Sequence, residues 1–275
     1  MESLAGFRKL EEIEPSDLRN RRDTAILLAA GRRYAEAIDE MRRLVERAPD
    51  DLRAGVELAS LPYVASGSTR EMEQFLARLT PAQSKSGQGI ALRKTWAMHH
   101  GDLAEAVQLD RLQPPDSGWA LDMAIVLVAQ GNIDAARSRL GTLPAELRTQ
   151  AESGLANSYV WADLGVAEAI LGHKEEALRC ARKALELMPE SHDAVVAANS
   201  RSSLALVDTL IGDKEAAIAE YAALFRTPYG ISGSAGRLPD ASVHTMRRDP
   251  RYAALRGDPR WEALLNDPKN NQPLF

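Results

Sequence analysis

Side chains that could carry out chemistry are few in this 275-residue chain, and they are poorly grouped. His99 and His100, with Asp102, form the one local cluster of metal-ligand types, but adjacent histidines on a helix point about 100° apart and do not share a face. No G-x-S-x-G string marks a nucleophilic serine, and no glycine-rich phosphate loop occurs. We therefore expect no catalytic residue, no metal site and no cofactor. The alternative, a helical enzyme that uses His99 or Asp163, is disfavoured.

The remaining candidate groups have structural interpretations. The single cysteine, Cys180, excludes an internal disulfide framework and lies in a predicted helix, where a small apolar thiol usually packs in the interior. The acidic pair Glu175-Glu176 opens a predicted helix, where negative charge interacts favourably with the helix dipole. Arg19, Arg21 and Arg22 are flanked by acids and lack interleaved aromatic residues. This pattern favours an ion-paired helix surface over a nucleic-acid patch.

Composition indicates a soluble, folded and mainly helical protein. Apolar residues make up 45% of the chain and charged residues 27%, whereas aromatic residues make up only 5%. The net charge of -5 does not favour a nucleic-acid partner. No apolar run approaches the roughly 18 residues that a membrane span needs, and the N-terminus lacks the apolar segment of a secretion signal. We expect a cytoplasmic protein without a membrane partner.

One pattern recurs along the chain: an apolar helical stretch, a glycine with a polar turn, and a second helix that carries an alanine. The turn glycines are Gly31, Gly67, Gly101, Gly131, Gly172 and Gly212. Glycine accepts the positive φ that ends the first helix, and a small alanine lets two antiparallel helices approach closely. Those alanines are Ala37, Ala106, Ala136, Ala177 and Ala217, with Met72 in the second unit. The pattern predicts about six helical hairpins.

Residues 158–191 resemble the tetratricopeptide repeat. The matching signature places are Trp161, Leu164, Gly165, Ala177, Ala184 and Pro189. Glu168 and Ala181 depart from the pattern, because the family has large side chains at those places. The resemblance implies an all-α fold: a right-handed superhelical array of about six hairpins with a short helical C-terminal cap. We expect a helical lead-in over residues 1–17, the array over 18–226, a linker over 227–240, and capping helices and a tail over 241–275.

The tail contains two Asp-Pro-Arg-aromatic motifs, at residues 249–252 and 258–261. In each, the aspartate is placed as a helix N-cap and the proline at the first helical position. The apolar side chains expected to cover the exposed end of the sixth hairpin are Tyr252, Leu255, Trp261 and Leu265.

The resemblance also implies a binding groove on the concave face, which the first helix of each hairpin lines. The groove positions that we carry over as candidate partner-binding residues are Gln88, Thr95, His99, Tyr159, Asn199 and Ser202. Tyr159 and Trp161 lie about 200° apart around a helix, so burial of Trp161 would leave Tyr159 for the groove. The alternative is that neighbouring units or the C-terminal helices simply cover these positions.

The predicted function is therefore a scaffold or sensor that binds another protein or a peptide segment and catalyses no reaction. The C-terminal half also resembles the tetratricopeptide regions of bacterial signalling proteins, which follow kinase, cyclase or winged-helix domains. The alternative function is thus the regulatory half of such a signalling enzyme or transcription regulator, whose output domain is absent from this chain. The sequence identifies neither the partner nor the oligomeric state.

Overall fold

The computed structural model describes residues 6, 8–10, 13–14, 17–112, 119–154, 157–189, 194–228 and 242–275. Over these ranges the regular structure is entirely helical and contains no strand, which confirms the all-α class. None of the helices in these ranges is long and apolar enough to cross a membrane.

Consecutive helices of the described chain form six pairs, and each predicted turn glycine lies between the two helices of one pair. The pairs are α2 (Leu18–Ala30) with α3 (Tyr34–Arg47), α4 (Leu52–Ser66) with α5 (Arg70–Arg78), α7 (Gly87–His100) with α8 (Leu103–Asp110), α9 (Ala120–Ala129) with α10 (Ile133–Leu140), α12 (Ser158–Leu171) with α13 (Lys174–Leu187), and α14 (Ala194–Ile211) with α15 (Lys214–Leu224). How many of these pairs are tetratricopeptide repeats stays a prediction.

The turns follow the expected geometry at every pair except the first. Positive φ values occur at Gly67, Gly101, Gly131, Gly172 and Gly212. The prediction is wrong for Gly31, whose φ is -80°, and the left-handed conformation falls instead on Arg32, with a φ of 60°. The C-terminal residues pack against this turn, where the Leu274 N–H donates to the Gly31 carbonyl oxygen.

Close contact within the pairs depends on the predicted small side chains. Complete burial, with an exposed fraction of 0%, is found for Ala37, Ala106, Ala136, Ala177 and Ala217. In the best-matched pair, a Cβ atom added at Gly165 of α12 would lie 3.1 Å from the carbonyl oxygen of Ala177 in α13. In this pair the helices approach so closely that only small residues fit at the contact.

Two helices lie between pairs and were not predicted. The short helix α6 (Pro81–Lys85) precedes the third pair, and α11 (Leu143–Glu152) precedes the fifth. The side chains of Leu147 and Ala151 in α11 belong to one apolar cluster with Leu164 and Cys180. The array therefore contains more than repeated pairs.

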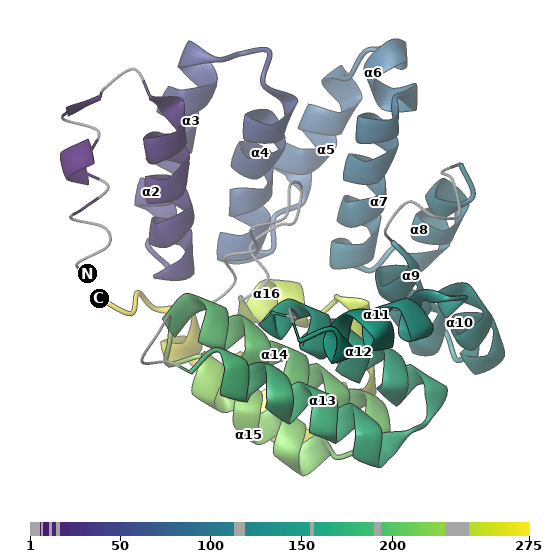
Figure 1. Ribbon diagram of the computed structural model, residues 1–275. Coiled ribbons are helices and arrows are strands. Elements are labelled where there is room, and N and C mark those ends of the chain that lie inside the picture. Colours follow the sequence, from purple (N-terminus) through teal and green to yellow (C-terminus); the bar gives the residue numbers. More distant parts are fainter. Residues whose placement is uncertain are drawn as a thin grey trace.

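The path of the chain brings its two halves to face one another (Figure 1). Helices α2 to α7 stand side by side in the upper part of the view, the chain turns downward through α8, α9 and α10, and α12 to α15 form the lower part. The C-terminal segment contains α16 (Val243–Met246), the 3-10 helix η1 (Pro250–Leu255), α17 (Pro259–Asn266) and the 3-10 helix η2 (Pro268–Asn271). Figure 1 shows α16 between the upper and lower helices.

Contacts place the C-terminal segment against the first helix of several pairs as well as against the last pair. Helix α16 contacts α4, η1 contacts both α9 and α14, and α17 contacts α15. The sequence predicted packing on the end of the sixth pair, with cover of the groove positions by the C-terminal helices as the alternative. The segment therefore spans the array instead of extending it.

The first and last pairs also meet directly. The Arg32 guanidinium donates from Nη2 to the carbonyl oxygen of Phe225 at 2.6 Å and lies 5.4 Å from the centre of the Phe225 ring. The backbone N–H of Leu274 donates to the carbonyl oxygen of Gly31 at 3.1 Å. The array is thus closed, whereas its handedness stays a prediction.

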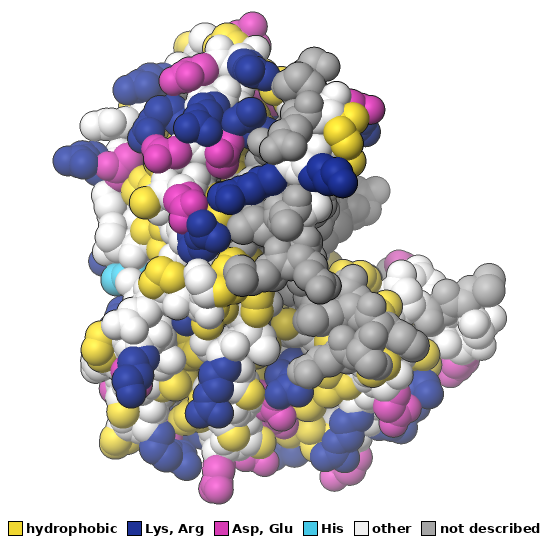
Figure 2. Space-filling model, turned by 90° about the vertical axis from the view of Figure 1, so that its left-hand side faces the viewer, with side chains coloured by type: hydrophobic (Ala, Val, Ile, Leu, Met, Phe, Trp, Pro, Cys, Tyr) yellow, Lys and Arg dark blue, Asp and Glu magenta, His cyan; other side chains and the backbone are white. Residues whose placement is uncertain are grey.

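Charged side chains at the N-terminal helices are paired, as the sequence predicted. Arg21 lies 2.6 Å from Glu40, and Arg22 lies 2.6 Å from Asp51 and 2.9 Å from Glu57. Basic and acidic side chains are interspersed on the face that Figure 2 shows.

Candidate functional site

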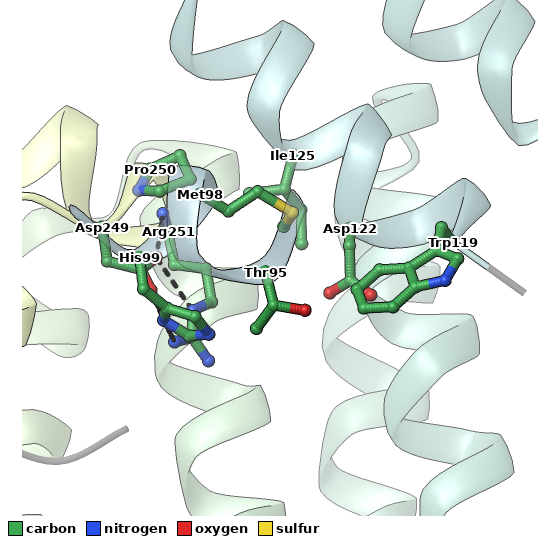
Figure 3. A pocket seen from close by; sticks show the side chains of 9 residues that line it. All are labelled: Thr95, Met98, His99, Trp119, Asp122, Ile125, Asp249, Pro250 and Arg251. Carbon is green, nitrogen blue, oxygen red and sulfur yellow. Dashed lines mark hydrogen bonds and ion pairs between the residues drawn. The ribbon is translucent and has the colours of Figure 1, made fainter. Parts of the chain in front are cut away.

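A small pocket lies where α7 and the region of α9 meet the C-terminal segment (Figure 3). Its lining combines side chains from three parts of the chain: Thr95, Met98, His99, Trp119, Asp122, Ile125, Asp249, Pro250 and Arg251. The cavity has a volume of about 20 Å³. That volume holds roughly one water molecule, so the pocket has no room for a small-molecule substrate while the C-terminal segment is in place.

Local sequence positions both sides of this pocket. Helix α7 begins at the N-cap Ser86, whose hydroxyl accepts from the Gly89 N–H at 3.0 Å. Thr95 and His99 are four residues apart, so they lie on one face of α7, and both side chains are buried. On the other side, the Asp249 carboxylate caps η1 by accepting from the Arg251 N–H at 2.9 Å. The first Asp-Pro-Arg motif thus starts a helix that faces α7.

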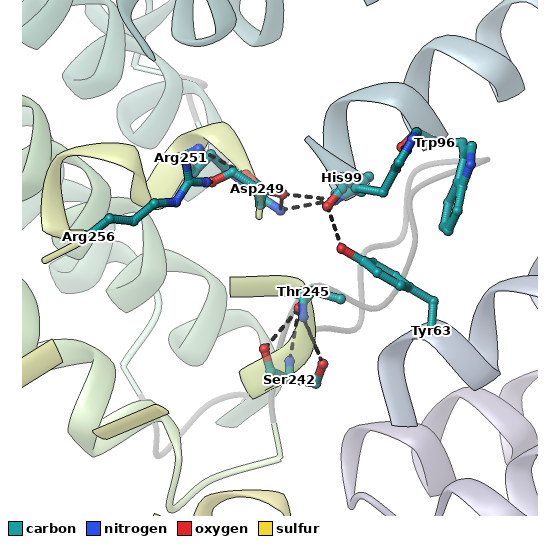
Figure 4. A network of polar contacts seen from close by, with 9 residues as sticks. Tyr63, Trp96, His99, Ser242, Thr245, Asp249, Arg251 and Arg256 are labelled. Atoms are coloured by element: carbon teal, nitrogen blue, oxygen red, sulfur yellow. Dashed lines mark hydrogen bonds and ion pairs between the residues drawn. The ribbon is translucent and has the colours of Figure 1, made fainter. Parts of the chain in front are cut away.

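A polar network joins α4, α7 and the C-terminal segment (Figure 4). His99 Nδ1 lies 2.8 Å from Asp249 Oδ2, and the Tyr63 hydroxyl donates to the His99 carbonyl oxygen at 2.9 Å. Arg251 Nη2 lies 2.6 Å from Asp249 Oδ2. Arg256 donates from Nη2 to the Asp249 carbonyl oxygen at 2.7 Å. Asp249 is therefore the centre of the network, and only 2% of its surface is exposed.

The charge of Asp249 is stabilised by its neighbours. Burial by itself would raise the pKa of this carboxyl, but the Arg251 charge and hydrogen bonds from His99 and Arg251 hold the pKa well below its ordinary value. Asp249 is consequently an ionised, fully partnered group at neutral pH. A shift of the C-terminal segment would remove His99 from this carboxylate while Arg251 moved with it, so the buried charge favours one register of docking.

A second buried ionic group lies close to the pocket and was missed in the sequence. The Lys94 ammonium, with an exposed fraction of 0%, lies 3.0 Å from Asp110 and 4.4 Å from the centre of the Trp119 ring. Asp110 also pairs with Arg139 of α10 at 3.2 Å. Burial lowers the pKa of Lys94, while the bond to Asp110 opposes that shift. The group connects the third and fourth pairs, and its residues are too far apart in sequence to form a motif.

The structure brings together two of the six predicted groove residues. Thr95 and His99 line the pocket beside the C-terminal segment, whereas the other four do not. Gln88 is exposed in the first turn of α7, and Asn199 and Ser202 are half-buried on α14. Tyr159 keeps 51% of its surface exposed. The role of all six in binding a partner stays a prediction.

Tyr159 and Trp161 differ in burial in the expected direction. Trp161 is partly buried against the apolar cluster of α11, α12 and α13, and the Arg179 guanidinium lies 5.4 Å from the centre of its ring. Tyr159, on the opposite side of the helix, is exposed.

Glu168, which departs from the repeat signature, has its own partners. Its carboxylate is fully buried, pairs with Arg148 of α11, and lies 2.6 Å from His173 Nδ1. The unpredicted helix α11 thus supplies a basic group at the place where the family has a large side chain. No group of three or more acidic, histidine or cysteine residues within the described ranges could hold a metal ion.

Comparison with known proteins supports the assignment of one repeat. The family model of the tetratricopeptide repeat matches residues 158–191, which include α12, the Gly172 turn and α13. No curated protein matches the chain significantly. Repeats of this kind stack into extended concave surfaces that bind other proteins. The match therefore supports a protein-interaction role and identifies no reaction.

Proposed function

We propose that this protein is a scaffold that binds another protein or a peptide segment on the inner face of its helical array and has no catalytic activity. The observation that carries the proposal is that this face already accommodates a polypeptide. Asp249, Pro250 and Arg251 lie against Thr95, Met98 and His99 of α7, and Thr95 and His99 are two of the groove positions that the resemblance to the repeat family implies.

The proposed binding surface extends beyond this pocket to Gln88, Tyr159, Asn199 and Ser202. Tyr159 offers an exposed aromatic ring, and an amide such as that of Asn199 can hydrogen-bond with a peptide backbone. In this proposal residues 18–226 form the right-handed array, and 241–275 form the C-terminal cap.

The proposal excludes nucleic acid and membranes as partners, requires no cofactor and places the protein in the cytoplasm. The net charge of -5 and the mixed charges on the face in Figure 2 both disfavour nucleic acid.

Quantitative affinity capture from a lysate of the source organism tests the proposal with two double variants. Tyr159→Ala with Asn199→Ala alters the proposed surface, and Glu186→Ala with Leu187→Ala alters exposed residues at the end of α13 as the control. We expect the first variant to capture at least about tenfold less of the proteins that the wild type and the control both capture. Its free energy of unfolding should change by less than about 1 kcal/mol. Equal recovery with both variants would place the binding surface elsewhere.

A further inference from the structure

We propose that residues 242–275, called the latch below, cover the inner face as an internal ligand and must detach from the N-terminal helices before a partner can bind there. The inference rests on the proposed function for the identity of the surface, but the opening of the latch can be tested without any partner.

Several contacts of the latch with the N-terminal pairs are polar, and the Phe275 ring adds an apolar contact with Gly31. Asp249 pairs with His99 of α7 at 2.8 Å, and the Asn271 side-chain amide donates to the Ala65 carbonyl oxygen of α4 at 3.3 Å. The Leu274 N–H donates to the carbonyl oxygen of Gly31 at 3.1 Å. Because water can replace such bonds, each contributes only a modest net free energy.

Its contacts with the last pair are apolar. The side chains of Tyr252, Leu255 and Trp261 are at most 1% exposed, and they share one cluster with Tyr221 and Leu224 of α15. The ring centres of Tyr221 and Trp261 are 5.5 Å apart. That cluster also takes in Val243 and Met246 of α16, and it includes no described side chain of α2 to α8.

The two kinds of contact give the latch a direction of opening. Burial of large aromatic and aliphatic side chains anchors it to α15, because exposing them to water is unfavourable. The polar contacts to α2, α4 and α7 are the ones that can separate first. The latch would then swing away from the N-terminal pairs while staying attached to the last pair.

Opening would uncover the predicted groove residues Thr95 and His99 together with Met98. A partner segment that replaces the latch must present a carboxylate to His99, in place of Asp249, and an apolar group to Met98 and Ile125. We therefore assign the partner to short segments that contain an acidic residue next to apolar ones.

Thiol labelling measures the opening directly. The native cysteine, Cys180, is buried in the core, and burial raises its pKa to about 12, so it contributes little background. Thr95→Cys places a thiol under the latch, whereas Ala97→Cys places one in the apolar cluster that α7 shares with α8 and α9. We expect the first thiol to react at least about tenfold faster than the second, and Asp249→Asn to accelerate the first alone, as expected for local opening. Equal rates would mean that the latch opens only with global unfolding, which would overturn the proposal.

A disulfide lock then connects opening to binding. A Cβ atom added at Gly67 would lie 3.8 Å from the Cβ of His244, a separation that suits a disulfide bond. In the lysate capture described above, the double variant Gly67→Cys with His244→Cys should hold the proteins that the wild type holds when it is reduced. It should lose them when it is oxidised. The reduced and oxidised forms of this variant carry the same backbone strain at position 67, where φ is 80°. They therefore differ only in the disulfide bond.

The outcomes separate the two proposals. Rapid labelling at position 95 combined with equal capture by both redox forms would show that the latch opens but that partners bind away from the inner face, which would refute the proposed function. Slow labelling with capture that depends on Tyr159 and Asn199 would refute the latch and leave the proposed function in place.

Discussion

Gly31 lies beneath the aromatic ring of Phe275, so closely that a Cβ atom added at Gly31 would be 2.5 Å from Cζ of that ring. The backbone of Gly31, with φ -80° and ψ 3°, suits any residue. Glycine here permits the close approach of another segment and is not needed for conformational freedom, in contrast to the other pairs.

Gly31→Ala should loosen the end of the latch without unfolding the first pair. The added methyl group would displace the Phe275 ring, and we expect the Leu274 N–H, which donates to Gly31, to lose much of its protection from hydrogen exchange. Phe275→Ala provides the background for a double-mutant cycle. In the Phe275→Ala background, Gly31→Ala should have little further effect on the free energy of unfolding. If Gly31→Ala destabilised that background as much as the wild type, the result would contradict the contact.

Adjacent alanines of α10 test the close packing of a pair. Ala136 is completely buried and Ala135 is exposed, so leucine at the first position overpacks the contact while leucine at the second faces solvent. Ala136→Leu should lower the free energy of unfolding by about 1 to 3 kcal/mol, and Ala135→Leu should change it by less than about 0.5 kcal/mol. Denaturant unfolding of both variants measures the difference. Similar midpoints would mean that α9 and α10 are not in close contact.

Arg148→Ala should be more destabilising than the loss of an ordinary surface ion pair. Its partner, the Glu168 carboxylate, is fully buried and would retain His173 alone. We expect a loss of about 1 to 3 kcal/mol in the free energy of unfolding, because a buried charge loses a partner. Arg42→Ala is the matched control, since it pairs with Asp39 and both side chains are more than half exposed; its cost should stay below about 1 kcal/mol. Equal costs would show that α11 is not held by Glu168.

Asp208 should make the protein less stable as the pH rises. This side chain is only 5% exposed, and burial together with the charges of Asp213 and Glu220 raises its pKa to about 6. The folded state then binds more protons than the unfolded state between about pH 4 and 6, so the free energy of unfolding falls across that window.

The Asp208→Asn variant should remove this dependence. Its gain in stability over the wild type should be small near pH 4 and reach at most roughly 3 kcal/mol above pH 7. Thermal or denaturant unfolding as a function of pH checks the prediction, with the exposed Asp39 changed to asparagine as the control. A constant difference between Asp208→Asn and the wild type at all pH values would contradict the unfavourable burial of this carboxylate.

Local features of the fold could be predicted from the sequence because they depend on neighbouring residues. A turn glycine such as Gly172 and a small residue such as Ala177 lie within one helical pair, so their spacing is visible in the chain. The helix α6 also had such a signal that the repeat pattern obscured. Thr80 and Gln83 form a capping box around Pro81, which is readable as a helix start.

Long-range contacts had no comparable signal. Arg32 and Phe225 are 193 residues apart, and neither stands in a motif that would pair them. The aromatic residues of the tail indicated a packing surface, but not that Asp249 would reach His99 on α7. Only the alternative in which C-terminal helices cover the groove anticipated the position of the latch, and it named no contacts.

The contact between Arg32 and Phe225 changes how a stack of helical pairs is expected to come apart. An open array depends on contacts between neighbours, so its terminal units can fray one at a time. Here the first turn bonds to the last pair and to the C-terminal residues, and neither end is left to fray independently. Loss of the first pair would expose part of the last, so melting should resemble the all-or-none transition of a globular protein. The described helical pairs thus form a closed series of contacts, in which the first pair meets the last.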